Sequence, residues 1–327
     1  MIGVAIASAA GLYIFGPLSQ LARAASIVTD NARGILAVLA ASTAFVVNDA
    51  MVKLASAELP SGEIIFIRGA LATVMLSIGV LALGAGRPLS LLADPMMLVR
   101  LWSSAGATVF IVIGLRHLPL ATVNSVLQVT PLAVTAGAAL VFGERVSLQR
   151  WAAALTGFLG VALIVRPDAA SFGVGASFVL IALLFTTVRD LTTRGLASDI
   201  PSIFVAAGSA VAISAAGFAV APFDDPWRWP SERAWLWLAL AAGCLFIATT
   251  FMIVALRTAE VSVVAPFRYV PVPLSILLGW WWWNEVPDRI ACLGIVLVLA
   301  AGLYVVNRER LSLSSAKTTT ADRSPAE

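Results

Sequence analysis

The sequence predicts an all-α integral membrane protein with ten transmembrane helices, arranged as two inverted five-helix repeats about a shared central site. Three observations support this: an apolar composition, ten long apolar runs, and a set of landmarks in the first half that recurs at a constant offset in the second. Of the 327 residues, 60% are hydrophobic and only 12% are charged, whereas a soluble domain usually carries about 25% charged residues. Such a chain cannot cover itself with a water-soluble surface, so we expect it to lie in a lipid bilayer.

The apolar runs are close to the length of a membrane-crossing helix, which needs about 20 residues. Short connections separate them. The longest, "FDDPWRWPSER" at 223–233, has the prolines and charges of a water-facing turn. The runs use up the chain and leave no soluble domain. We expect spans at 34–54, 63–83, 97–115, 120–141, 149–166, 173–194, 202–221, 234–256, 261–282 and 289–307.

The two ends of the chain differ from the spans between them. Residues 1–33 are apolar and then basic; the apolar part is short for a span and lacks the basic start of a signal peptide, which leaves an eleventh span open. Residues 308–327 are polar and are expected to form a disordered tail. Basic residues near the span ends divide ten against six between the two sides, which favours cytoplasmic termini.

A repeat appears when the two halves are aligned without gaps so that Gly34 meets Gly175. We call this shift the repeat offset. It also matches residues of the same type or charge: Asp49 with Asp190, Lys53 with Arg194, Glu58 with Asp199, Pro60-Ser61 with Pro201-Ser202, and Glu144 with Glu285. The repeat offset predicts one five-helix unit at 34–166 and another at 173–307. Five is an odd number, so the second unit enters the membrane from the opposite face, as in many secondary transporters.

Four stretches carry a resemblance to a known family: "MVKLASAELPSGEIIFIRG" (51–69), "NSVLQVTPL" (124–132), "GERVSLQRWAAALTGFLGVALIVRP" (143–167) and the second-half counterpart at 271–307. The chain resembles the EamA-type ten-helix permeases of the drug/metabolite transporter superfamily over about residues 33–308. The resemblance implies a central cavity, cytoplasmic termini in the inner membrane, and export or uptake of small metabolites by alternating access. One departure is Asn284-Glu285, where the family has Gly-Glu, although asparagine also tolerates a left-handed conformation.

The candidate substrate-binding residues lie in the second, fourth and ninth spans. Arg68 is charged and lies inside the second span, where it either binds an anionic part of the substrate or snorkels to the interface or pairs with an acid. Prolines predict breaks in the fourth and ninth spans, and broken helices in membranes line cavities or contact protein. Polar and aromatic side chains beside these breaks complete the set: Asn124, Gln128, Arg268 and Tyr269. The polar ones either line the cavity or form hydrogen bonds between helices. Tyr269 either stacks on a planar ligand or packs against the protein.

Two charge pairs repeat at the same spacing in both halves. Asp49 and Lys53 are four residues apart on one helix face, as are Asp190 and Arg194. One interpretation is that Asp49 couples transport to protons or binds a cation. The other, favoured by the duplication, is that each pair neutralises itself as a structural ion pair.

The sequence lacks the motifs of several other classes of protein. One histidine and two separated cysteines indicate no zinc or haem site, and the absence of a P-loop argues against ATP-driven transport, so we expect neither a cofactor nor an enzyme. The thinly spread basic residues favour no nucleic-acid partner. The expected partners are the bilayer and a small-molecule substrate, for which the arginines favour an anionic group. A non-transporting membrane partner protein and a lipid-acting membrane enzyme remain alternatives, and the oligomeric state is not readable.

Four consecutive tryptophans, Trp280 to Trp283, precede Asn284. Successive residues of a helix turn by 100°, so four in a row circle it and cannot all face one ligand. They share one depth, which is typical of an aromatic belt at a membrane interface. We therefore interpret them as a boundary of the ninth span and not as a binding pocket.

Overall fold

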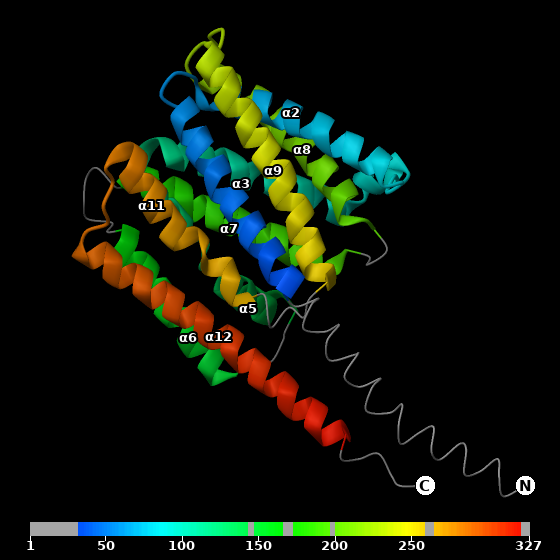
Figure 1. Ribbon diagram of the computed structural model, residues 1–327, viewed down its shortest axis with the longest axis vertical. Helices are drawn as coiled ribbons and strands as arrows, with labels where there is room; N and C mark the ends of the chain where they lie inside the picture. The colour runs from blue at the N-terminus through cyan, green and yellow to red at the C-terminus, as the bar shows by residue number, and fades with distance from the viewer. Residues whose placement is uncertain (1–31, 143–146, 166–172, 197–199, 259–264, 322–327) are drawn as a thin grey trace, which may run out of the picture.

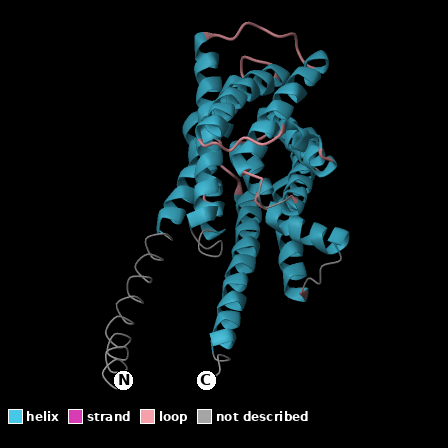
Figure 2. Cartoon of the chain, turned by 90° about the vertical axis from the view of Figure 1, so that its right-hand side faces the viewer, coloured by secondary structure: helices cyan, strands magenta, loops and turns pink. Residues whose placement is uncertain are grey.

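The computed structural model describes residues 32–142, 147–165, 173–196, 200–258 and 265–321. Within these ranges the regular elements are all helices (Figure 2). In chain order they are the first helix (Ala32–Ala55), α2 (Ser61–Ala82), η1 (Leu89–Ala93), α3 (Pro95–His117), α4 (Leu120–Leu127), α5 (Thr130–Phe142), α6 (Leu148–Val165), α7 (Gly173–Gly195), α8 (Ser202–Val220), η2 (Ala221–Phe223), α9 (Glu232–Thr258), η3 (Ala265–Tyr269), α11 (Pro271–Trp283) and α12 (Arg289–Ala321).

Eight helical segments of the described ranges are long and apolar enough to cross a membrane. They cover the first helix, α2, α3, α4 together with α5, α7, α8, α9 and α12. The apolar part of α6, Trp151–Val165, is shorter, and α11 follows η3 after a break. The prediction of a multi-pass, all-α membrane protein is therefore confirmed, and the helices agree with ten spans. The segment 1–31, with its open eleventh span, lies outside the described residues.

The fourth and ninth spans are broken, as their prolines predict. α4 ends at Leu127 and α5 begins at Thr130, whose hydroxyl donates a hydrogen bond to the Leu127 carbonyl at 2.6 Å. In the ninth span, the short η3 helix ends at Tyr269 and α11 begins at Pro271. Proline lacks an N–H and fits the first turn of a helix, where that group would have no partner within the helix. Each proline-containing span is thus divided into two helical pieces.

The two halves of the chain start their helices at matching positions. α2 and α8 both follow a proline N-cap with extended backbone. The repeat offset relates the first residues of three pairs of helices: Ser61 of α2 and Ser202 of α8, Thr130 of α5 and Pro271 of α11, and Leu148 of α6 and Arg289 of α12. The helix boundaries thus agree with the repeat read from the sequence.

Helices at equivalent positions of the two halves also pack against each other. α2 lies along α8, and α6 lies along α12 (Figure 1). At the α6–α12 crossing, a Cβ atom built on Gly160 would lie 2.7 Å from the Gly294 carbonyl oxygen. At the α2–α8 crossing, a Cβ atom on Gly69 would lie 2.9 Å from the backbone of Ser214. Small residues therefore let these helices approach closely, as is common between membrane helices.

The bundle has two ends because consecutive helices run in opposite directions. The start of α2 meets the end of α8, since Gly62 faces Gly217. We call this the Lys53 end, because the first helix ends there. At the opposite end the start of α3 meets the end of α7, where Met96 faces Gly195. We call this the Asp190 end.

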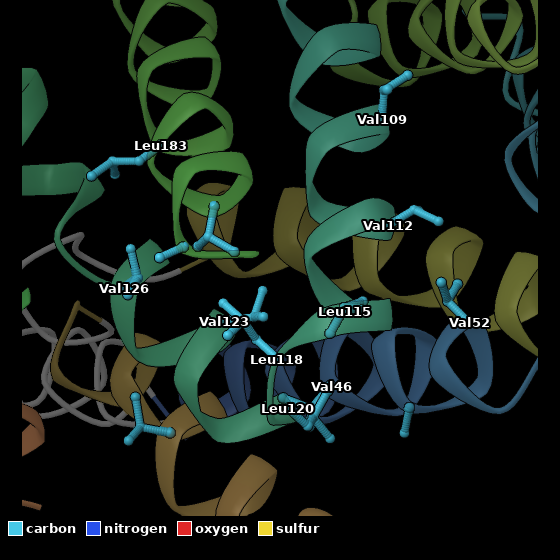
Figure 3. Packing of buried hydrophobic residues seen from close by; sticks show 14 of the residues in the cluster. Val46, Val52, Val109, Val112, Leu115, Leu118, Leu120, Val123, Val126 and Leu183 are labelled. Atoms are coloured by element: carbon cyan, nitrogen blue, oxygen red, sulfur yellow. The ribbon is translucent and has the colours of Figure 1, made fainter. Parts of the chain in front are cut away.

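The main hydrophobic core joins the two halves of the chain. Figure 3 shows part of it: Leu118 and Leu120, on either side of the connection between α3 and α4, pack near Val46 of the first helix. Leu183 of α7 belongs to the same buried cluster. The α3–α4 connection is thus held among buried aliphatic side chains close to the first helix. This fixes the start of the broken fourth span.

The last helix differs from its expected length. The sequence predicted a disordered polar tail from residue 308, whereas α12 continues to Ala321. No proline or glycine occurs between Leu303 and Ala321, so nothing in the backbone chemistry stops the helix within this segment. The prediction rested on polarity, which does not by itself end a helix.

Candidate functional site

A cluster of polar side chains connects the first helix, α2 and α4 near the Lys53 end. Arg68 Nη1 donates a hydrogen bond to Asn48 Oδ1 at 3.0 Å, and Asn48 Nδ2 donates to Asp49 Oδ1 at 3.0 Å. Asn124 Nδ2 donates to Asp49 Oδ2 at 3.4 Å and to the Leu120 carbonyl at 3.2 Å. We call Asn48, Asp49, Arg68 and Asn124 the Arg68 cluster.

Arg68 is enclosed by protein. Only 5% of the residue's surface is exposed. It lies seven positions after Ser61, the first residue of α2, which is about 10 Å along the helix. Its Nε atom is buried and has no hydrogen-bond partner among the described residues. Of the interpretations left open by the sequence, snorkelling to the interface does not fit this position. A buried guanidinium with an unused donor is suited to bind an anionic or carbonyl oxygen.

Lys53 pairs with the other half of the chain and not with Asp49. Its Nζ atom lies 2.6 Å from Glu285 Oε1 and donates a second hydrogen bond to the Leu118 carbonyl at 2.8 Å. Glu285 Oε2 accepts the Leu120 N–H at 3.1 Å. The expected Asp49–Lys53 pair is therefore wrong. The i,i+4 spacing allowed it, but Glu285 binds Lys53 from the far half of the sequence, and Asp49 binds amide groups instead.

A left-handed residue at the end of α11 brings Glu285 to this position. Asn284 has φ 53° and ψ 31°, the left-handed conformation expected for an asparagine that replaces glycine here. Its N–H donates to the Trp280 carbonyl, and the Glu285 N–H donates back to the Gly279 carbonyl at 3.0 Å. The bond from Asn284 to Trp280 is that of a left-handed (αL) helix cap. The chain reverses direction there, and the Glu285 carboxylate points to Lys53.

The four tryptophans divide into three exposed residues and one that faces Lys53. Trp280, Trp281 and Trp282 are exposed, whereas the ring centroid of Trp283 lies 5.1 Å from the Lys53 ammonium. A cation over an indole face is electrostatically favourable. The four rings and the adjacent asparagine line a surface hollow. A second hollow lies over η3 and α12, and neither is lined by the Arg68 cluster.

The breaks in the fourth and ninth spans meet each other. Gln128 Nε2 donates a hydrogen bond to the Arg268 carbonyl at 3.1 Å. Arg268 is exposed, whereas Tyr269 is 7% exposed and its hydroxyl lies against Gly302 of α12. Of the two roles open to Tyr269, the structure therefore shows packing against α12. Asn124 joins the Arg68 cluster, and Gln128 joins the two breaks.

A second polar cluster lies at the Asp190 end, between α3, α7 and α8. Arg189 and Asp190 form an ion pair at 2.8 Å, although they are adjacent in sequence. Arg100 Nε donates to Thr193 Oγ1 at 3.0 Å, and Arg100 Nη1 donates to Ser209 Oγ at 2.6 Å. We call these five residues the Arg100 cluster. The side chain of Arg194, the expected partner of Asp190, lies outside the described residues.

Sequence reasoning missed Arg100 and Ser209 as site residues, although a signal for Ser209 was present. The repeat offset takes Arg68 to Ser209, which therefore occupies the equivalent position of the second half. Arg100 had no such signal, because the equivalent residue is Ala241. Among the described residues, no group of three or more histidine, cysteine, aspartate or glutamate side chains is suited to hold a metal ion.

Further polar contacts connect the Lys53 end to the chain around η2 and the start of α9. Asp224 Oδ2 accepts the Gly62 N–H at 3.0 Å, and Glu63 Oε2 accepts the Arg228 N–H at 3.0 Å. Arg116, at the end of α3, lies 3.8 Å from Asp224 Oδ1. The two backbone hydrogen bonds and the Lys53–Glu285 pair join the two halves of the chain at this end, whereas the Arg116 contact is longer than a hydrogen bond and partly exposed.

Most of the chain is similar to known membrane transporters. The family model described as the EamA-like transporter family matches residues 32–166 and again 173–308. The pseudopaline exporter of Pseudomonas aeruginosa is 32% identical over 281 residues, which cover 82% of this chain and 94% of the exporter. The riboflavin transporter of Vibrio cholerae is 27% identical over 287 residues, covering 85% of this chain and 94% of that protein.

Two further similarities are more distant. The S-adenosylmethionine uptake transporter of Rickettsia prowazekii is 24% identical over 276 residues, which cover 82% of this chain and 90% of that protein. One crystal structure superposes with a TM-score of 0.59 at 22% identity, covering 85% of this chain and 99% of the other. The latter similarity concerns the fold alone.

Proposed function

Since the chain belongs to the EamA-like transporter family, we propose that it is a secondary active transporter that binds a small organic metabolite at the Arg68 cluster and moves it by alternating access. Its family and the relatives above are transporters and not enzymes. The observation that carries the proposal is Arg68: a buried guanidinium between the first helix, α2 and α4, with an unused Nε donor. Ionisable groups inside membrane helices commonly mark substrate pathways.

In this proposal Arg68 binds an anionic or carbonyl oxygen of the substrate. Asn48 accepts a hydrogen bond from the guanidinium and is itself held by its hydrogen bond to Asp49, and Asn124 offers an amide on a neighbouring helix. The breaks at Gln128 and Arg268 lie close to the same region of the bundle and leave backbone groups for a polar solute. The expected central cavity would lie between these elements.

Alternating access requires that the Lys53 end open and close. The Lys53–Glu285 pair joins the two halves there, at a half-buried position. For the substrate to leave or enter at this end, that pair and the contact with the Leu118 carbonyl must separate. Two inverted repeats can do this by rocking against each other about a fixed site.

Localisation and direction complete the proposal. Ten basic residues against six favour both termini in the cytoplasm, with the protein in the inner membrane. The Lys53 end then faces outward. The relatives are named both for export and for uptake, so direction follows from measuring which way solute moves.

Coupling is assigned to Asp49, which is the carboxylate within the Arg68 cluster. It accepts hydrogen bonds from two amides and lies next to a guanidinium. We expect the flux to depend on pH, and we expect Asp49→Asn to remove this dependence because the variant cannot exchange a proton. A pH dependence that is unchanged in Asp49→Asn would assign the residue to structure.

The experiment that tests the function compares metabolites in a deletion strain and an overexpression strain. A solute that rises in one and falls in the other is then followed in liposomes that contain the purified protein. Arg68→Gln should reduce its flux about 10- to 100-fold, the loss expected when a hydrogen bond to a charged group is removed. Arg116→Gln, at the partly exposed end of α3, is the matched control and should retain flux. Absence of any solute change, or full flux in Arg68→Gln, would overturn the proposal.

A further inference from the structure

The Arg100 cluster holds its guanidinium differently from an arginine that snorkels to the membrane interface. Arg100 lies between α7 and α8 and donates to two neutral hydroxyls, those of Thr193 and Ser209. Ser209 is only 7% exposed, so the guanidinium reaches into the protein. A snorkelling arginine would instead place its charge in the headgroup region.

The cluster contains more positive than negative charge. Asp190 is already paired with Arg189 at 2.8 Å, and Arg100 lies within electrostatic range of both. Two guanidinium groups therefore share one carboxylate among the described residues. A surplus charge in membrane helices is costly unless a counter-charge is present. A bound anion would supply it.

The repeat offset connects this cluster with the Arg68 cluster. Asp49 corresponds to Asp190, and Arg68 corresponds to Ser209. The second half therefore has a hydroxyl where the first half has a guanidinium, and Arg100 of α3 brings a guanidinium to that hydroxyl at 2.6 Å. The two halves place the same chemical group beside equivalent aspartates by different routes.

Access also differs between the two clusters. The side chains of Arg189 and Asp190 are 34% and 33% exposed, whereas Arg68 is 5% exposed. At the Lys53 end an ion pair joins the two halves. A solute from the Asp190 side thus meets the Arg100 cluster before the Arg68 cluster.

We propose that Arg100 and Arg189 form a second subsite that binds an oxyanion, either a carboxylate or a phosphate, of the transported solute. The hydroxyls of Thr193 and Ser209 hold Arg100 in place, since each donates its own proton to a helix carbonyl and accepts from Arg100. This proposal rests on the proposed function. The subsite would hold the solute on the Asp190 side, either before the solute reaches the Arg68 cluster or after it leaves that cluster. Guanidinium groups bind both oxyanions through paired hydrogen bonds. The same chemistry occurs in the headgroup of an anionic lipid, which the test must separate.

The test measures thermal unfolding of the full-length protein in a neutral detergent, with inorganic phosphate as the probe. Phosphate is compared with chloride at equal ionic strength and pH. We expect phosphate to raise the melting temperature by about 2–4 °C. The rise should disappear in Arg100→Gln and in Arg189→Gln. Arg116→Gln removes an arginine of the same helix as Arg100, at its opposite end, and should retain it.

A second variant and a lipid probe complete the experiment. Should Arg100→Gln not fold, Arg100→Lys keeps the charge without the paired donors and should weaken the phosphate effect. No phosphate effect in the wild type, or a full effect in both glutamine variants, overturns the subsite. The subsite is also overturned if the phosphate-induced rise in melting temperature is lost only in Arg68→Gln. It is likewise overturned if short-chain phosphatidylglycerol raises the melting temperature but phosphate does not. This is a binding measurement, so its failure leaves liposome flux, and with it the proposed function, intact.

Discussion

The Lys53–Glu285 ion pair allows a quantitative test of how the two halves are held together. The atoms lie 2.6 Å apart, and the side chains are 10% and 22% exposed. At an effective dielectric constant of about 20, two unit charges at this distance attract by about 6 kcal/mol. Desolvation offsets much of this attraction, so the net value of the pair is smaller than the cost of breaking it.

Glu285→Gln removes one charge and leaves the Lys53 ammonium over Trp283. Removing one partner of a fully buried pair costs about 3–5 kcal/mol. Because both groups keep some contact with solvent and Lys53 keeps the Leu118 carbonyl, we expect a loss of about 2–3 kcal/mol. For a protein of this size, that corresponds to a fall in melting temperature of about 3–8 °C.

The assay is a double-mutant cycle followed by thermal unfolding in detergent. Lys53→Met and Glu285→Gln are measured singly and together. We expect the double variant to be more stable than the sum of the single losses predicts, by about 2 kcal/mol, since no uncompensated charge remains in it. Arg116→Gln, which breaks longer contacts of 3.8 and 3.6 Å at a more exposed position, should cost less than about 1 kcal/mol. Strictly additive losses for Lys53 and Glu285 would refute the reasoning.

Three further predictions concern the backbone and the helix crossings, and all are measured by thermal unfolding. Asn284→Val should cost about 1–2 kcal/mol, because a β-branched residue resists the left-handed conformation, whereas Asn284→Gly should be nearly neutral; equal losses would contradict this. Gly160→Val should cost about 1–3 kcal/mol through its clash with the facing carbonyl on α12, whereas Gly86→Val, with open space around it, should not. Gln128→Ala should cost about 1 kcal/mol by removing the hydrogen bond to Arg268, and no loss would mean that water replaces it.

Local chemistry in the sequence predicted much of the fold. The prolines at 131 and 271 predicted two broken spans, and the breaks occur beside them. Asparagine tolerates the left-handed conformation of the glycine that it replaces, and Asn284 adopts this conformation. These features depend on backbone geometry that the residue itself imposes, so the sequence is sufficient to predict them.

The partners of the charged residues were harder to predict. Lys53 and Asp49 are four residues apart, and helix geometry alone favours a pair. The structure prefers Glu285 because the left-handed Asn284 turns the chain back at the Lys53 end. Arg100 was missed for a related reason: it has no equivalent in the second half, and only the packing of α3 against α7 and α8 brings it to Ser209. Such pairings depend on tertiary contacts, which a single sequence does not encode locally.

The repeat gives these tertiary pairings a functional meaning. In a protein with inverted repeats, the opposite state arises when the two halves exchange their local conformations. A contact that closes one end should then have a counterpart of equivalent residues for the other end. The repeat offset relates Lys53 to Arg194 and Glu285 to Glu144, again a basic and an acidic residue. The sequence thus contains charges for closing either end, whereas the residues between the ends, Arg68 and Ser209, differ. Under the proposed function, the residues that close either end should therefore be equivalent in the two halves, whereas the guanidinium near each equivalent aspartate comes from a different position of the chain, Arg68 in one case and Arg100 in the other.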